Sequence, residues 1–181
     1  MERLKRASVI IDLADELLKE GSWCGETHLQ KITFFLQDLL KVPLDYDFIL
    51  YKHGPFSFDL CDELTAMRAD RLMEYVIKMY PYGPSLVPTK TGRIIKENFF
   101  QKTIDQNKPK INFISSRLGN KGVAELEKLG TALFVTLKER QLVDASKRAQ
   151  RINSIKPHIS LEEATTAIRE VDQIIHEANV L

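Results

Sequence analysis

The chain has 181 residues and a formal net charge of only +1, so no overall positive field draws it to nucleic acid. Hydrophobic residues make up 44% and charged residues 28%, a balance typical of a globular protein with a packed core. Because no run of about 18 apolar residues and no apolar signal-peptide segment occurs, we expect neither a membrane span nor a signal peptide.

The first forty residues predict two amphipathic helices. Residues 3–20 place apolar side chains at helical spacing, and Gly21 is a suitable end for that helix. A second helix is expected to begin at Thr27, because Thr27-x-x-Gln30 matches a capping box, in which hydroxyl and amide satisfy backbone donors reciprocally. Its apolar face predicts a core element, and Pro43 closes it.

The stretch YKHGPFSFDL follows an aromatic and β-branched segment at 46–51 that predicts a short strand. Gly54 can adopt backbone angles closed to other residues, and Pro55 suits the first turn of a helix because its missing N–H would be unpaired there anyway. Ser57 is a suitable N-cap for a helix over 57–70. We interpret Gly54, Pro55 and Ser57 as a structural joint that turns the chain from strand to helix.

A β-hairpin is predicted after that helix. Residues 72–80 have strand character, the Pro- and Gly-rich segment 81–84 predicts a turn, and residues 85–87 can return as the second strand. Thr89 or Thr91 then begins another helix.

The remainder of the chain predicts helices only. Pro109 and Gly119 interrupt residues 101–119, and we expect a short helix between them. Asn120 is expected to cap a long helix that runs to about residue 149. A second capping-box match at 160–163 opens a last helix.

This order of elements predicts an α+β fold that is mainly α. We expect a winged-helix-like core with a β-hairpin at about 25–100, together with N- and C-terminal helices. Residues 1–100 would form the winged-helix-like unit with its N-terminal helix, and residues 101–181 a helical extension packed on it as part of one structural unit.

Three segments resemble the Panacea domain, a group of bacterial and phage proteins that includes antitoxins related to the SocA type. They are HLQKITFFLQ (28–37), FILYKHGPFSFDLCDEL (48–64) and VPTKTG (87–92), and the resemblance covers roughly residues 25–100. It implies a non-enzymatic interaction domain. In toxin–antitoxin pairs such domains neutralise a partner protein, either by masking it or by delivering it to a protease.

Catalytic chemistry finds little support in the residues. His53 could serve as a base, but no nucleophile or orienting group stands at useful local spacing. Cys24 and Cys61 lie in no redox, metal or protease motif, so we expect small buried hydrophobes in a reduced, cytoplasmic setting. The four histidines are scattered, without a His-x-x-x-His pair: His28, His53, His158 and His176. We predict no enzyme, no metal and no cofactor.

Nucleic acid is a disfavoured partner. In a winged helix the helix before the hairpin would enter the major groove, yet residues 57–70 carry four acidic residues against one arginine, a net charge of −3. Residues 90–110 and 138–156 each carry a net charge of +4, which is usually a solvated face. The alternative to a protein-binding module is therefore a winged-helix DNA-binding regulator that uses the basic C-terminal segment.

The leading hypothesis is a protein-interaction module, antitoxin-like or an accessory protein of a bacterial or phage defence or toxin–antitoxin locus. A homo-oligomer is compatible with the sequence. The expected partner-binding residues flank the joint or lie in the basic segment: His53, Phe56, Lys147, Arg148 and Arg151.

Overall fold

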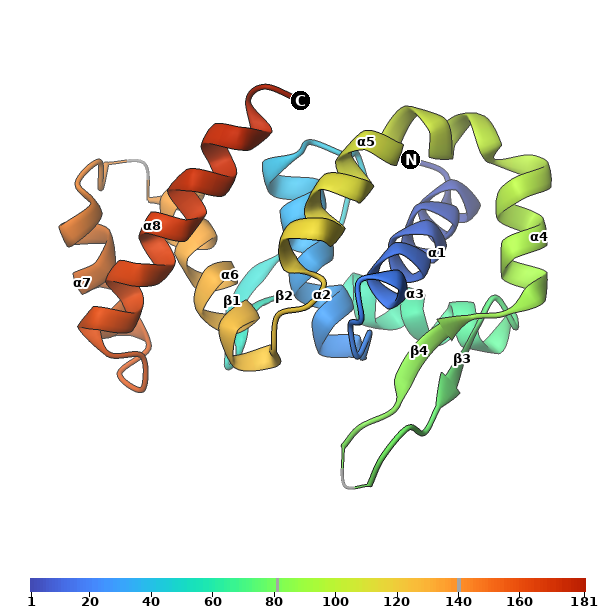
Figure 1. The fold of residues 1–181 in the computed structure, drawn as a ribbon, viewed down its shortest axis with the longest axis horizontal. Coiled ribbons are helices and arrows are strands. Elements are labelled where there is room, and N and C mark those ends of the chain that lie inside the picture. The colour runs from blue at the N-terminus through green and yellow to red at the C-terminus, as the bar shows by residue number, and fades with distance from the viewer. Residues whose placement is uncertain (81, 140) are drawn as a thin grey trace.

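A computed structural model describes residues 1–80, 82–139 and 141–181 (Figure 1). Within these residues the fold is α+β and mainly helical, as the sequence predicts. The helices are α1 (Arg3–Lys19), α2 (Glu26–Phe34), the π-helical η1 (Phe35–Leu39), α3 (Phe58–Ala69), α4 (Lys90–Phe99), α5 (Gln101–Leu118), α6 (Val123–Lys138), α7 (Ala145–Ile155) and α8 (Leu161–Ala178). The strands are β1 (Ile49–Tyr51), β2 (Gly54–Phe56), β3 (Met73–Val76) and β4 (Ser85–Pro88).

The core is built from α1, α2 and the helices that cover them. Helix α1 packs against α4 and α5, and α2 packs against α6 and β2. Residues 28–36 are all buried, so α2 and the first residues of η1 run through the interior as a central element. The aromatic rings of Phe34 and Phe35 lie in the middle of this core, with Phe48 and Phe134 against Phe34. Burial of this kind contributes most of the stability of such helices.

The N-terminal helix is confirmed to within a residue, but the predicted capping box at Thr27 is wrong. Helix α2 begins at Glu26 with Gly25 as its N-cap, and no side chain caps it. The Gln30 amide points elsewhere, to the backbone of Ser57. A tertiary contact has therefore replaced the local one that the spacing suggested.

The strand predicted at 46–51 is shorter than expected and belongs to a tight hairpin. Strand β1 pairs antiparallel with β2, in register Ile49 with Phe56, Leu50 with Pro55 and Tyr51 with Gly54. Pro55 therefore sits in a strand, and its predicted place in the first turn of a helix is wrong. A two-stranded sheet tolerates proline because the missing N–H can fall on an unpaired edge. Ser57 is confirmed as the N-cap of α3, its hydroxyl accepting from the Leu60 N–H at 3.3 Å.

A second antiparallel hairpin, β3–β4, pairs Met73 with Pro88 through to Val76 with Ser85, and projects from the helical body (Figure 1). The two sheets are separate, so β1 pairs with β2 rather than with this hairpin. The predicted turn at 81–84 includes Pro81, which lies outside the described residues. Thr89 caps α4, accepting from the Gly92 N–H at 3.0 Å, which settles the expected start between Thr89 and Thr91.

Two predictions for the C-terminal part are wrong. Helix α5 is continuous through Pro109. The proline has no N–H to donate to the Asp105 carbonyl, but both residues face solvent, so water can satisfy that carbonyl. The long helix expected from Asn120 to residue 149 is two helices, α6 and α7, and α6 is capped at Gly122. The capping box that opens α8 is confirmed, with Ser160 and Glu163 bonding to each other's backbone N–H groups.

The helices after residue 100 complete the structure formed by those before it. Helix α5 lies along α1, α6 covers α2 and β2, and α7 and α8 extend the molecule at the end opposite to α4 (Figure 1). Among the described residues, no helix combines the length and the apolar character needed to cross a membrane.

Candidate functional site

The β1–β2 hairpin is fastened to α2 by two buried polar side chains. Gln30 accepts a hydrogen bond from the Ser57 N–H and donates one to the Ser57 carbonyl, both at 2.9 Å. The Lys31 ammonium donates to the Pro55 carbonyl at 2.8 Å. Only 1% of Gln30 and 2% of Lys31 is exposed. These bonds satisfy the backbone of residues 55–57 and fix the start of α3 relative to α2.

The opposite side of the hairpin rests on α6 at two glycines. Gly54 has φ +88°, and a Cβ at that position would lie 3.2 Å from the Glu127 carbonyl oxygen. A Cβ on Gly130 would lie 2.9 Å from the Pro55 Cδ. The hairpin and the helix therefore approach more closely than larger residues would allow. The positive φ of Gly54 confirms the special backbone expected there.

Charged groups from three separate segments surround the hairpin turn. The buried Glu127 carboxylate contacts His53 Nδ1 at 3.4 Å and His158 Nε2 at 2.9 Å. Lys156, at the end of α7, donates to the carbonyl groups of Tyr51 and Lys52. Burial lowers the pKa of Lys156, and the Glu127 charge opposes that effect. The turn is thus held by α6 and by the α7–α8 connection.

Sequence reasoning missed this convergence. The histidines are scattered along the chain, but His53 and His158 share one carboxylate although 105 positions separate them. No local spacing could reveal it, because the contact depends on how α6 and the α7–α8 connection pack on the hairpin. Within residues 1–80, 82–139 and 141–181, no three His, Cys, Asp or Glu side chains are arranged to hold a metal ion.

Lys31 is the most perturbed charge of the site. Burial lowers its pKa to about 8; the Glu127 charge opposes the shift and the Lys156 charge adds to it. Lys31 also lines a cavity of about 350 Å³ between α2 and the hairpin, and the cavity walls are formed by Glu26, Thr27, Gln30, Lys31, Tyr51, His53, Gly54 and Phe56. The candidate site therefore combines a buried ammonium group with aromatic walls.

Three aromatic rings from the hairpin and the first residue of α3 form one cluster, here called the aromatic patch: Tyr51, Phe56 and Phe58. Their ring centroids are 5.8 Å apart for Tyr51 and Phe56, 5.1 Å for Phe56 and Phe58, and 6.0 Å for Tyr51 and Phe58. Tyr51 is 53% exposed and Phe58 57% exposed. Grouped exposed aromatics on a monomer surface mark an interaction site more often than isolated ones do.

The two cysteines do not supply a nucleophile to this site. Cys24 is buried in the core, and burial raises the pKa of its thiol to about 12. Cys61 is half-buried, and burial together with its hydrogen bond to Glu26, at 3.2 Å, raises its pKa to about 11. Both thiols are therefore protonated at neutral pH, which is the unreactive form.

The expected basic partner-binding residues on α7 are mostly engaged within the chain. Arg148 is only 7% exposed, and its guanidinium makes two hydrogen bonds of 2.7 Å to Asp172 on α8. Arg151 binds the Glu139 carboxylate at 2.9 and 3.0 Å, whereas Lys147 is exposed. The structure thus places His53 and Phe56 together on the hairpin, and Lys147, Arg148 and Arg151 on a separate element. Arg140, counted in the basic segment, lies outside the described residues.

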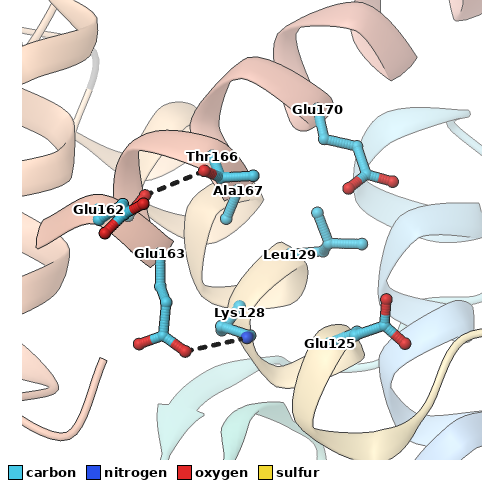
Figure 2. A pocket seen from close by; sticks show the side chains of 8 residues that line it. All are labelled: Glu125, Lys128, Leu129, Glu162, Glu163, Thr166, Ala167 and Glu170. Carbon is cyan, nitrogen blue, oxygen red and sulfur yellow. Dashed lines mark hydrogen bonds and ion pairs between the residues drawn. The ribbon is translucent and has the colours of Figure 1, made fainter. Parts of the chain in front are cut away.

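A groove between α6 and α8 is lined by four glutamate side chains: Glu125, Glu162, Glu163 and Glu170 (Figure 2). It encloses about 220 Å³, with Leu129 and Ala167 among its walls. Lys128 pairs with Glu163 at 3.2 Å, and Lys121 pairs with Glu170 at 2.8 Å. Much of this acidic charge is balanced within the chain, so the groove is better explained as a helix–helix seam than as a binding site.

A second exposed apolar surface occupies the tip of the β3–β4 hairpin. Ile77 is 81% and Tyr80 92% exposed. The hairpin is tied to the body by Trp23, whose indole N–H donates to the Gly83 carbonyl at 2.8 Å and whose ring lies 5.6 Å from that of Tyr82.

No family model matches the chain, and no curated protein matches it.

Proposed function

We propose that the protein is a non-enzymatic protein-interaction module, antitoxin-like or an accessory protein of a bacterial or phage defence or toxin–antitoxin locus. Its partner docks on the aromatic patch. The observation that carries this proposal is a cluster of three mutually packed aromatic rings, two of them more than half exposed, on the hairpin and the first residue of α3, which α2, α6 and Lys156 hold in place.

Immobilisation of the hairpin favours binding because little order has to be created on association. Affinity is reduced by the ordering of loops and side chains, and a surface already fixed in its bound form avoids much of that loss. Aromatic side chains also dominate the energetics of protein interfaces. Gln30, Lys31 and Gly54 build the fixed base, and the rings stand outside it.

The resemblance to Panacea domains supports the same proposal from a different direction. The residues that carry it include Gln30, Lys31, Gly54, Pro55 and Ser57. These are the residues that fasten the hairpin to α2 and α6. We extend the proposal to the fold: α3 with the β3–β4 hairpin forms a winged-helix-like unit, which here presents a protein-binding surface.

A DNA-binding regulator has less support. Groove reading by α3 is opposed by the net charge of −3 over residues 57–70. The basic alternative on α7 loses Arg148 to Asp172 and Arg151 to Glu139. Phosphate contacts require cations that are free to leave their internal partners.

The test is binding to a partner protein, with the small protein encoded next to this one as the first candidate. The double variant Tyr51→Ser/Phe58→Ser removes two rings that are more than half exposed, so the melting temperature should hardly change. Binding measured by calorimetry should weaken about tenfold or more.

Phe99→Ser is the matched control, because Phe99 is an exposed aromatic residue on α4. It should bind the partner as the wild type does. If the double variant binds equally well and Tyr80→Ser does not, the partner docks on the β3–β4 hairpin and the assignment to the aromatic patch is wrong. If co-purification finds no specific protein partner, the proposed function itself fails.

A further inference from the structure

Lys31 is a buried cation that lacks a counter-ion. Within the part of the chain that the structure describes, no carboxylate oxygen lies within 4 Å of its ammonium nitrogen. The Pro55 carbonyl accepts its one hydrogen bond, at 2.8 Å, although an ammonium group carries three protons. Buried charges in proteins are normally paired, because removing them from water is costly.

Two carboxylates belong to the site, but within the described residues neither lies within ion-pair distance of Lys31. Glu127 contacts both His53 and His158. Glu26 lines the same cavity as Lys31, and its carboxylate accepts from the Cys61 thiol at 3.2 Å. Lys31 therefore has no carboxylate in direct contact in the described part of the chain, and the Glu127 charge acts on it only from a greater distance.

The cavity offers the space in which a counter-ion can arrive. It measures about 350 Å³, which is at the lower end of the range for ligand sites and sufficient for a side chain. Tyr51 and Phe56 line it together with Lys31 and also belong to the aromatic patch. A group that enters the cavity thus passes beside the surface on which the partner docks.

We propose that the cavity receives the carboxylate of an Asp or Glu side chain of the partner protein, which pairs with Lys31 while an adjoining apolar residue packs on the aromatic patch. This inference rests on the proposed function and specifies the chemistry of the partner. A carboxylate and an ammonium form a charge-assisted hydrogen bond, which is stronger in a site with little water. An amide of the same shape can accept a hydrogen bond from the ammonium group but carries no negative charge to balance it.

The test compares three short peptides on the full-length protein: acetyl-Phe-Glu-Phe-amide, acetyl-Phe-Gln-Phe-amide, and acetyl-Phe-Gln-Phe with a free terminal carboxylate. Binding is followed through the backbone amide NMR signals of Gly54 and Ser57, which flank the Lys31 acceptor. The glutamate peptide should bind the wild type about tenfold more tightly than the glutamine amide. In Lys31→Met, which keeps the apolar stem, the two peptides should bind alike.

Lys52→Met is the control, because Lys52 lies in the same hairpin with an exposed side chain. It should preserve the preference for glutamate. The comparison of peptides on the wild type needs no variant, so the inference stays testable if Lys31→Met does not fold.

Equal binding of the glutamate and glutamine amides to the wild type would overturn the inference. A preference seen only for the free terminal carboxylate would also overturn it, since the site would then read a chain end. If no peptide binds at about 10 mM while the partner protein still depends on Tyr51 and Phe58, the inference fails and the proposed function stands.

Discussion

Replacing Gly54 with alanine tests whether the hairpin lies as close to α6 as the structure shows. Two glycines of the chain have similar left-handed backbones, Gly21 at φ +81° and Gly54 at φ +88°. A Cβ on Gly21 would meet no atom within 4 Å. One on Gly54 would lie 3.2 Å from the Glu127 carbonyl oxygen and 3.4 Å from the Thr131 hydroxyl. Gly21→Ala is therefore a matched control for the backbone effect alone.

The two substitutions share one contribution and differ in another. A left-handed backbone costs an L-residue about 1–2 kcal/mol, and the smaller entropy of the unfolded alanine chain offsets part of that equally in both variants. Only Gly54→Ala adds crowding, and the nearest atom belongs to the backbone of α6, which cannot rotate away. Overpacking adds about 1–3 kcal/mol. We expect Gly54→Ala to lose about 2–4 kcal/mol of unfolding free energy and Gly21→Ala about 1 kcal/mol.

Urea unfolding followed by circular dichroism measures both losses on one scale. The melting temperature of Gly54→Ala should fall below that of Gly21→Ala by about 2–4 °C for each kcal/mol of difference. Gly54→Val should lose more than Gly54→Ala, because its branched side chain meets the same atoms. Equal losses in the two alanine variants would refute the close contact between the hairpin and α6.

Three further predictions concern stability. Burial lowers the pKa of Lys31 from 10.5 to about 8, so between these pH values the unfolded chain binds more protons than the folded one. The unfolding free energy of the wild type, relative to that of Lys31→Met, should therefore rise by up to about 3 kcal/mol from pH 8 to pH 10.5. A flat difference between the two proteins across that range would contradict the burial of the charge. Arg148→Met breaks the ion pair of the buried Arg148 with the partly exposed Asp172 on α8 and should lose about 1–3 kcal/mol in urea unfolding, while Lys147→Met stays within about 0.5 kcal/mol; similar small losses in both would contradict the pairing. Ser160→Ala removes a helix cap and should lose about 1 kcal/mol, whereas Ser154→Ala, exposed in the last turn of α7, should lose none; equal effects would argue against the cap.

Local chemistry predicted the beginnings of several helices well. Ser57 and Ser160 cap α3 and α8 because a hydroxyl placed at the first turn satisfies nearby N–H groups whatever surrounds it. The special backbone of Gly54 is local in the same sense. Where the deciding contact is local, the sequence pattern and the structure agree.

Predictions failed where distant segments compete for the same group. The Gln30 amide fits a capping box three residues after Thr27, but its better partner is the backbone of Ser57, 27 positions away. Pro109 reads as a helix break, yet solvent can satisfy the carbonyl that it leaves unpaired. Whether a carbonyl faces water is a property of the packed molecule, which periodicity alone does not provide.

The candidate site shows the same limit more strongly. The aromatic residues and the Gly-Pro pair of the hairpin are contiguous in sequence, so their importance could be recognised. The Glu127 contacts with His53 and His158 join three segments, and only the packing of α6 and of the α7–α8 connection on the hairpin creates them. Residues 138–156 carry a net positive charge, but a count of charges cannot show that Arg148 pairs with Asp172.

The part of the chain before residue 100, which carries the proposed binding site, therefore depends on the part after it. The hairpin belongs to the first half, but Glu127, Gly130, Lys156 and His158 of the second half hold its turn and its glycine face. A second tie joins the halves at the other end of the molecule, where buried Asp12 on α1 accepts from Lys96 on α4 and Lys108 on α5 at 3.1 and 2.9 Å. Because α6 and the α7–α8 connection hold the hairpin that carries the aromatic patch, the C-terminal helices are better understood as the support of the proposed binding site than as an appendage to it.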